Sequence, residues 1–541
     1  MIRYAIPLLM VLSLYMTQAE GQGFLKAKNR IIVNDKGEKV ILRGMGLGGW
    51  MLQEGYMLRV GSIGPQYRIK EKIAELAGRD KTEQFYEGWL DNFIRRADID
   101  SMAAWGFNSV RIPMHYRLFT REKGFVMLDS LLSWCKANKI YLILDMHAAP
   151  GGQGNDLNIS DRDPSIPSLW QSEANQQQMI SLWKKLAERY VNEPYIGGYD
   201  IINEPNWGFE DSTDRHGLAE KTNAPLRKLM MDITKAIRSV DKKHIIIIEG
   251  NGWGNNYKGV LPPWDDNMVL SFHKYWNHNT VASIQGPLDL REKYNMPLWM
   301  GESGENSNTW FTEAIRLVET HDIGWSWWPL KKMGSNNPLE IKIPHGYQQM
   351  LDYWEGKGPR PTEKEAQDAL DALLVAVRCE NNIYHRDVTD AMFRQVYSEE
   401  AIPFKQHVIE DALTIPAIEY DLGRQGIAWY DKDSSRTPGA KTQGNLGHVC
   451  RNDGVDITGD AGGYHIYSIE DGEWLQYTVD VKRSAEYKIL IDSTGSGQVS
   501  LYDNGKLIPA AGAYLSAGRH RIKVVADAGG FLLYALRFVR E

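Results

Sequence analysis

The chain of 541 residues has few cysteines, and they are scattered. There are three: Cys135, Cys379 and Cys450. An odd and widely spaced set does not make the framework of a small disulfide-stapled fold. Cys135 lies in LLSWCKANK, which has the pattern of a helix interior. We therefore expect free, buried thiols rather than disulfides.

The sequence also lacks an excess of basic residues and long apolar runs. Lys and Arg number 62 against 69 Asp and Glu, a net charge of −7. Without a basic stripe, a nucleic-acid partner held through its phosphates is not expected. Beyond the N-terminus, no segment of the sequence is apolar enough to span a membrane. It has no HExxH motif and no compact His/Asp cluster, which argues against a metal-dependent reaction.

The N-terminus has the layout of a cleaved secretory signal. Arg3 supplies an early positive charge, an apolar run covers Ala5 to Met16, and small residues lead to Ala19. The run is too short to span a membrane. No cysteine lies near the cut, so a lipid anchor is not indicated. We expect residues 1–20 to be a signal peptide and the mature protein to be secreted or periplasmic.

What the sequence does contain, from residue 40 to 330, is an alternation of short apolar runs with amphipathic stretches. The runs cover residues 40–47, 108–113, 140–147, 196–205, 244–250, 269–275, 297–304 and 324–330. Most stretches between them have apolar residues at three- and four-residue spacing, typical of helices. This pattern predicts an α/β fold, a parallel (β/α)₈ TIM barrel. A doubly wound open sheet is the alternative, but no Gly-rich phosphate turn follows the first run.

Two further regions follow the predicted strands. Residues 358–405 open with a capped helix, which we expect to be the last barrel helix followed by an elaboration, so the barrel domain takes residues 21–405. From Ile418 the pattern changes to short alternating strands with Gly, Asp and Asn turns, as in EWLQYTVDV. This predicts an antiparallel β-sandwich of jelly-roll type over residues 418–541. Residues 406–417 are then a linker.

Polar side chains stand where the predicted barrel strands end. A buried strand rejects such residues unless they are paired, and a barrel gathers the carboxyl ends of its strands at one functional mouth. The candidates are Arg111, His147, Asn203, Glu204, His273, Tyr275, Glu302 and Trp328. Glu204 and Glu302 fall on opposite sides of the mouth, as the paired carboxyl groups of a retaining glycosidase require. Any one candidate could be a paired core residue, but their convergence at one end favours an active site.

Six motifs also carry a resemblance to a known family. NSVRIP, LDMHAAPGGQGND, IINEP, FHKYW, WMGESG and WSWWPL, in this order, resemble the signature series of glycoside hydrolase family 5, whose members are retaining (β/α)₈ enzymes. The resemblance implies Glu204 as acid/base, Glu302 as nucleophile and Asn203 as partner of the sugar 2-hydroxyl. It implies further substrate-site roles for Arg111, His147, Tyr275, His273 and Trp328. It implies no cofactor for catalysis.

The opening of the barrel suggests a substrate. GMGLGGWMLQEG resembles the exo-β-1,3-glucanase branch of that family, which implies that Glu54 binds the hydroxyls of a terminal glucose and that Trp50 shapes a closed pocket. The 18 Trp and 26 Tyr have flat faces that suit sugar rings. We expect a polysaccharide or oligosaccharide substrate, with β-1,3-glucan favoured. A β-1,4-glucanase, a mannanase, a transglycosylase and a non-catalytic glycan-binding protein are the alternatives.

The C-terminal region resembles carbohydrate-binding module family 6, through RNDGVDI and EDGEWLQYTVDV among other stretches. Ser468 and Leu532 stand where that family has a stacking tyrosine and a sugar-binding asparagine, which predicts weak binding. Glu419 and Asp421 match the acidic opening of the module. They are candidates for a structural calcium site, with solvated surface acids as the alternative.

The tripeptide Asn-Glu-Pro occurs twice, at 192–194 and 203–205. The first copy follows a helical pattern, which Pro194 ends, near the face of the barrel where function is not expected. The second follows an apolar run and faces the mouth. We therefore expect Glu204, and not Glu193, to take part in chemistry.

Overall fold

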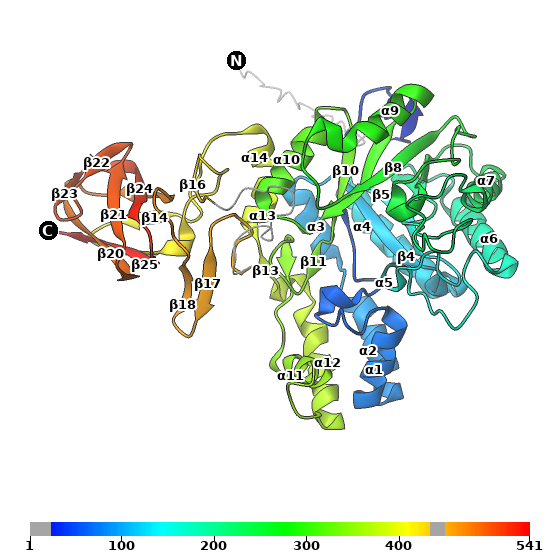
Figure 1. Ribbon diagram of the computed structural model, residues 1–541, viewed down its shortest axis with the longest axis horizontal. Coiled ribbons are helices and arrows are strands. Elements are labelled where there is room, and N and C mark those ends of the chain that lie inside the picture. Colours follow the sequence, from blue (N-terminus) through cyan, green and yellow to red (C-terminus); the bar gives the residue numbers. More distant parts are fainter. Residues whose placement is uncertain (1–22, 433–448) are drawn as a thin grey trace, which may run out of the picture.

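The computed structural model describes residues 23–432 and 449–541 (Figure 1). Within these ranges the chain forms a closed barrel, followed by a C-terminal domain of two mainly antiparallel sheets. The predicted signal peptide, residues 1–20, lies outside the described residues. Among the helices of the described ranges, none combines the length and the apolar character needed to cross a bilayer.

Eight parallel strands close into the barrel, as the sequence predicts. They are β3 (Arg43–Gly46), β4 (Ser109–His115), β5 (Tyr141–Ala148), β6 (Ile196–Asp200), β7 (Ile246–Ile248), β8 (Met268–Lys274), β9 (Leu298–Gly304) and β10 (Gly324–Trp328). The barrel closes between β10 and β3, where Trp325 lies opposite Arg43. Nearly every strand residue is buried, which is why the strands read as apolar runs and not as alternating patterns.

Amphipathic helices surround the strands. They are α3 (Arg96–Trp105), α4 (Glu122–Ala137), α6 (Glu173–Tyr190), α7 (Ala224–Arg238), α9 (Gln285–Tyr294) and α10 (Asn308–Glu319). In α7 the buried positions include Leu226, Leu229, Met230, Ile233 and Ile237. This spacing places them on one face, so α7 covers the barrel with one apolar stripe.

The capped helix of residues 358–377 does not take the expected place in the ring. It is α12 (Glu363–Ala376), and it packs mainly on α11 (His345–Trp354), α1 (Gln66–Ala77) and α2 (Arg79–Asn92). Figure 1 shows these four helices grouped at one side of the barrel. Beside α10 lie α13 (Arg386–Met392) and α14 (Arg394–Tyr397) instead. The local sequence specifies a capped amphipathic helix but not the surface that its apolar face covers.

A short hairpin, β1 (Lys26–Lys28) and β2 (Ile31–Val33), closes one end of the barrel. Leu25 and Ile32 belong to one buried cluster with Ile143, Ile247 and Trp299 of the barrel strands. This cluster seals the end where the strands begin. The opposite end, where the strands finish, remains available for a site.

The C-terminal domain is a sandwich of two six-stranded sheets. One sheet contains β14 (His407–Ile409), β16 (Trp429–Tyr430), β19 (Trp474–Val481), β21 (Gln498–Asp503), β22 (Lys506–Ile508) and β24 (Gly518–Ala528). The other contains β15 (Ala412–Pro416), β17 (Ile457–Asp460), β18 (Gly463–Ile466), β20 (Ala485–Gly495), β23 (Ala513–Leu515) and β25 (Phe531–Arg540). Tyr477 and Ile522 of the first sheet share one buried cluster with Ile489 and Phe538 of the second.

The segment predicted as a linker, residues 406–417, is part of this sandwich. β14 pairs in parallel with β19, and β15 pairs antiparallel with β25. The sandwich therefore starts at His407, and it contains one parallel pair where an antiparallel domain was expected. Both strands are short, and their partners lie far along the chain, so the local sequence did not distinguish them from a connection.

Candidate active site

Glu204 and Glu302 converge at the mouth of the barrel. Glu302 lies on β9, and Glu204 follows β6. A carboxylate oxygen of each lies within 4.8 Å of one of the other. Retaining glycosidases hold their carboxyl groups about 5–5.5 Å apart, whereas inverting enzymes need about 6.5–9.5 Å for a water molecule. The separation fits double displacement through a covalent intermediate.

Two donors hold the carboxylate of Glu302. Arg111 Nη1 donates to Oε2 at 2.9 Å, and Tyr275 Oη donates to Oε1, also at 2.9 Å. Arg111 Nη2 donates to Asn203 Oδ1 at 2.7 Å, which leaves Asn203 Nδ2 next to His147 Nε2 at 3.4 Å. The amide nitrogen of Asn203 is thereby oriented as a donor beside the nucleophile, as a contact to a sugar hydroxyl requires.

Further carboxylates surround Arg111, and sequence reasoning missed two of them. Arg111 Nε donates to Asp200 Oδ2 at 2.9 Å, Nη2 donates to Glu249 Oε1 at 3.1 Å, and Asp145 Oδ2 lies 3.3 Å from Nη1. Burial by itself lowers the pKa of Arg111, but these carboxylates raise it well above the usual value. Asp145 also contacts His147 Nδ1 at 2.7 Å. Asp145 and Asp200 are acids inside apolar runs, which signals that a buried cation must pair with them.

Glu204 is held by a different set of groups. His273 Nδ1 lies 2.6 Å from Glu204 Oε1, and the backbone N–H of Glu204 donates to Glu249 Oε2 at 2.7 Å. Burial raises the pKa of Glu204, His273 opposes the shift and Glu302 adds to it. Burial lowers the pKa of His273, but Glu249, Glu302 and Glu204 raise it well above its usual range. Glu204 is thus suited to hold a proton beside a charged imidazole.

The backbone of Glu204 is unusual as well. Its φ angle is +40°, in the left-handed region that residues other than glycine rarely adopt. Such a conformation persists only when its surroundings enforce it, and here the hydrogen bond to Glu249 does so. Glu249 also accepts from Arg111, so it connects the acid to Arg111 on the nucleophile side.

A pocket of about 470 Å³ opens above the two glutamates. Its lining includes Glu54, Tyr56, His147, Ile159, Glu204, Trp253, Asn255, His273, Tyr275, Trp276, Asn277, Glu302, Glu305 and Trp328. The indole of Trp328 stacks on His147, with ring centres 5.0 Å apart, and its Nε1 donates to Tyr56 Oη at 3.0 Å. Trp328 is thus a fixed flat wall of the pocket, and Tyr56 is a wall residue that sequence reasoning missed.

Glu54 lies in this pocket, as predicted. It is 7% exposed, and its Oε1 is 3.9 Å from His147 Nε2. Among the described residues none donates a hydrogen bond to its carboxyl group. Burial, followed by the charges of Glu302 and Glu204, raises the pKa of Glu54 well above its usual range. A buried carboxyl group that accepts no hydrogen bond from the described residues is ready to bond hydroxyl groups of a ligand.

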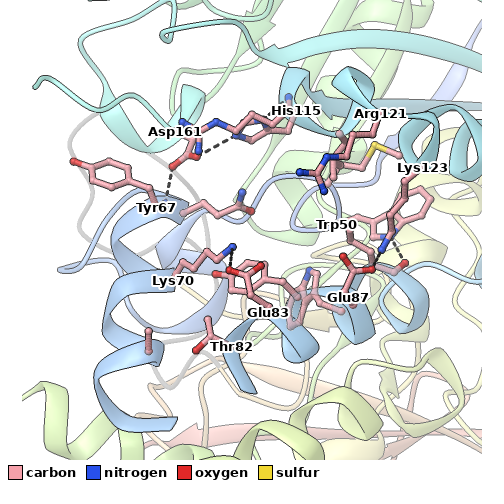
Figure 2. Close-up of a pocket in the computed structure, with 18 of the residues that line it drawn as sticks. Trp50, Tyr67, Lys70, Thr82, Glu83, Glu87, His115, Arg121, Lys123 and Asp161 are labelled. Carbon is pink, nitrogen blue, oxygen red and sulfur yellow. Dashed lines mark hydrogen bonds and ion pairs between the residues drawn. The ribbon is translucent and has the colours of Figure 1, made fainter. Parts of the chain in front are cut away.

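Trp50 does not line the pocket, and the prediction that it shapes the substrate site is wrong. Its ring is buried and its Nε1 donates to the carbonyl of Leu90 at 2.8 Å. It lines a separate groove of about 760 Å³ along α1 and α2, beside Glu87 and Lys123 (Figure 2). The turn before it is fixed by Trp89, whose Nε1 donates to the carbonyl of Gly49 at 2.9 Å. This contact draws the turn toward α2. Trp50 therefore lines the groove along α1 and α2, whereas Glu54 lines the pocket above the two glutamates.

Glu419 and Asp421 do not fit a calcium site. Asp421 is buried, and its carboxylate accepts hydrogen bonds from Thr478 N at 2.8 Å, Thr478 Oγ1 at 2.7 Å and Gln476 Nε2 at 2.9 Å. Glu419 pairs with Lys405. Calcium needs oxygen ligands that are free to coordinate it, and protein donors occupy these carboxylates. They act as structural polar groups of the sandwich.

The barrel matches known proteins in sequence. Residues 70–334 match the model of the cellulase family, glycosyl hydrolase family 5. A β-xylosidase of Phanerodontia chrysosporium is 32% identical over 262 residues, which cover 47% of this chain and 52% of that protein. A probable glucan 1,3-β-glucosidase A of Aspergillus clavatus is 31% identical over 270 residues, 48% of this chain and 61% of that protein. Endoglucanase C of Acetivibrio thermocellus is 25% identical over 319 residues, which cover 46% of this chain and 87% of that protein.

Proposed function

We propose that this chain, whose barrel is a glycoside hydrolase domain matching family 5, is a retaining β-glycosidase that acts on β-glucan. The observation that carries the proposal is the approach of Glu204 and Glu302 to within 4.8 Å. Each carboxyl group has its own partner, His273 for Glu204 and Arg111 for Glu302. These unequal surroundings assign the proton donor and the nucleophile.

The geometry supports a reaction in two steps. Glu302 attacks the anomeric carbon, while Glu204 protonates the departing glycosidic oxygen, and a glycosyl ester on Glu302 results. The ester is neutral, so the negative charge that raises the pKa of Glu204 disappears and this pKa falls. Glu204 then accepts a proton from water, which attacks the anomeric carbon and frees Glu302. Asn203 Nδ2 is placed to donate to the sugar 2-hydroxyl during both steps.

For the substrate we favour a β-1,3-glucan. The resemblance of residues 44–55 to exo-β-1,3-glucanases supports this, as does the relative named glucan 1,3-β-glucosidase. Glu54, a buried acceptor next to Trp328 and His147, fits the hydroxyls of a terminal sugar. The alternatives are hydrolysis of β-1,4-glucan, of mannan or of a β-xyloside, and transglycosylation. Other relatives are named endoglucanase and β-xylosidase.

A product analysis tests the proposal. Purified protein is incubated with laminarin, cellulose, lichenan, mannan and an aryl β-xyloside, and the anomer first released is recorded by NMR. We expect laminarin to be the best substrate and β-glucose to be the initial and only sugar product. Release of α-glucose would contradict the retaining mechanism. If no sugar were released, the barrel would be a non-catalytic glycan-binding domain. Products longer than the substrate would indicate transglycosylation.

We further propose export of the protein and a minor role in sugar binding for its sandwich. The layout of residues 1–20 supports export, and N-terminal sequencing of the mature protein tests it. Ser468 and Leu532 support weak sugar binding by the sandwich, because neither offers a stacking face or an amide. Calorimetric titration of the intact Glu302→Gln variant with laminarin oligosaccharides is expected to give one site per chain, whereas two tight sites would contradict this.

A further inference from the structure

A turn of the sandwich, Arg451–Asn452–Asp453, is buried against the barrel. The three residues are 0%, 7% and 1% exposed. The turn belongs to RNDGVDI, a motif for which neither the barrel chemistry nor the proposed function provides a role. Its middle residue, Asn452, contacts the barrel with both its main chain and its side chain.

The barrel segment that Asn452 contacts directly follows the nucleophile strand. The backbone N–H of Asn308 donates to the carbonyl of Asn452 at 2.9 Å, and Asn452 Nδ2 donates to the carbonyl of Asn306 at 2.8 Å. Asn452 Nδ2 also donates to Asn308 Oδ1 at 3.1 Å. These residues connect β9, which carries Glu302, to the start of α10. The sandwich thus completes the hydrogen bonding of an active-site loop.

A buried carboxylate on each side reinforces the contact. Asp387 Oδ2, from α13, accepts from Asn452 N at 2.8 Å and from Asn308 Nδ2 at 2.7 Å. Asp453 Oδ1 lies 3.0 Å from the same Asn308 nitrogen. On the sandwich side, Arg451 donates to Asp453 Oδ2 at 2.6 Å and covers the ring of Tyr420 at 3.5 Å. The turn is therefore fixed within its own domain and can hold the barrel loop in one position.

We propose that the sandwich is a positioning domain for the active site, and that Asn452 holds segment 305–308 so that Glu305 keeps its place in the pocket wall. Glu305 lines the pocket and pairs with Lys332. Its φ angle is +53°, a conformation that its surroundings must maintain. Glu302 is held separately, by Arg111 and Tyr275. Loss of the contact therefore affects the binding of substrate more than the chemistry.

The kinetics of Asn452→Ala test this role, which rests on the glycosidase activity of the barrel. We expect KM for the best substrate to rise about fivefold, the effect of losing one or two hydrogen bonds that hold the wall, while kcat changes by less than about twofold. Thr478→Val is the matched control, since it removes a buried hydrogen bond to Asp421 inside the sandwich and does not touch the barrel loop. A folded Asn452→Ala variant with the KM of the wild type would overturn the proposal.

A measurement without substrate separates this inference from the proposed function. Hydrogen exchange is followed in the wild type at the amide of Asn308, which donates to Asn452, and at the amide of Thr478, which donates to Asp421. We expect both to be protected, and we expect faster exchange at Asn308 in the milder variant Asn452→Ser. An Asn308 amide that exchanges freely in the wild-type chain would overturn the proposal, even if every variant failed to fold and no substrate were found.

Discussion

The two copies of Asn-Glu-Pro provide a control at the scale of single residues. Glu204→Gln and Glu302→Gln are expected to lower kcat by about 10²–10⁴-fold or more, because each removes a group that transfers a proton or forms the ester. Glu193 pairs with Lys136 at 2.7 Å and accepts from the Tyr195 amide, after α6. Glu193→Gln should therefore keep kcat near the wild-type value. Comparable losses of kcat in all three purified variants would contradict the assignment of Glu204 as the acid/base.

The pH dependence follows from the neighbours of Glu204. His273 is charged and lowers the pKa of Glu204, against the raising effects of burial, Glu302 and Glu249. His273→Asn removes this positive charge, so the pKa of Glu204 should rise. The alkaline limb of kcat/KM, which reports loss of the proton from the acid, is expected to move to higher pH. A profile of kcat/KM against pH on laminarin oligosaccharides measures the shift, and a limb that moved to lower pH would contradict it.

Most of the site could be predicted because its residues interrupt apolar runs. Arg111, His273 and Glu302 each stand inside or at the end of a buried strand, and such a residue must find a partner. Asp145 and Asp200 carried the same signal and were overlooked. Trp50 was misplaced for a different reason. The direction in which a loop side chain points depends on contacts such as that of Trp89 with Gly49, which local sequence does not specify.

At the scale of elements, the loop after β3 presents two functions within five residues. Trp50→Ala should lower the free energy of unfolding by about 3–5 kcal/mol, because it removes a buried indole between the loop and α2. KM should remain that of the wild type. Trp328→Ala should instead raise KM, since it removes the flat wall beside His147. Denaturant unfolding and steady-state kinetics on both variants distinguish the roles. A higher KM for Trp50→Ala would contradict this prediction and indicate that Trp50 contacts the substrate.

Regular elements were predicted where length and periodicity were strong. The eight barrel strands are buried on both sides, and their apolar runs identify them without knowledge of their neighbours. Strands β14 and β15 have three and five residues, and only pairing with β19 and β25 makes them strands. The same applies to α12, whose helical pattern was evident and whose packing partners were not.

At the scale of the whole molecule, stability does not depend on disulfides. Cys135 is buried, Cys379 and Cys450 are partly buried, and all three are free. Burial raises the pKa of Cys379 and of Cys450 to about 11, so few thiolates exist near pH 8. We expect slow reaction of the native protein with Ellman's reagent, three reactive thiols after denaturation, and the same Tm with and without dithiothreitol. A Tm that fell on reduction would indicate a disulfide.

The carboxylates around Arg111 have a consequence for the complete catalytic cycle. Each turnover converts Glu302 from an anion into a neutral ester and back. A buried guanidinium that lost its sole counter-ion at this stage would be strongly destabilised. Asp145, Asp200 and Glu249 remain as acceptors within 3.3 Å, so Arg111 stays bonded while the ester persists. The intermediate can therefore form without an unpaired buried cation, and Arg111 is in place to receive the carboxylate when the sugar leaves.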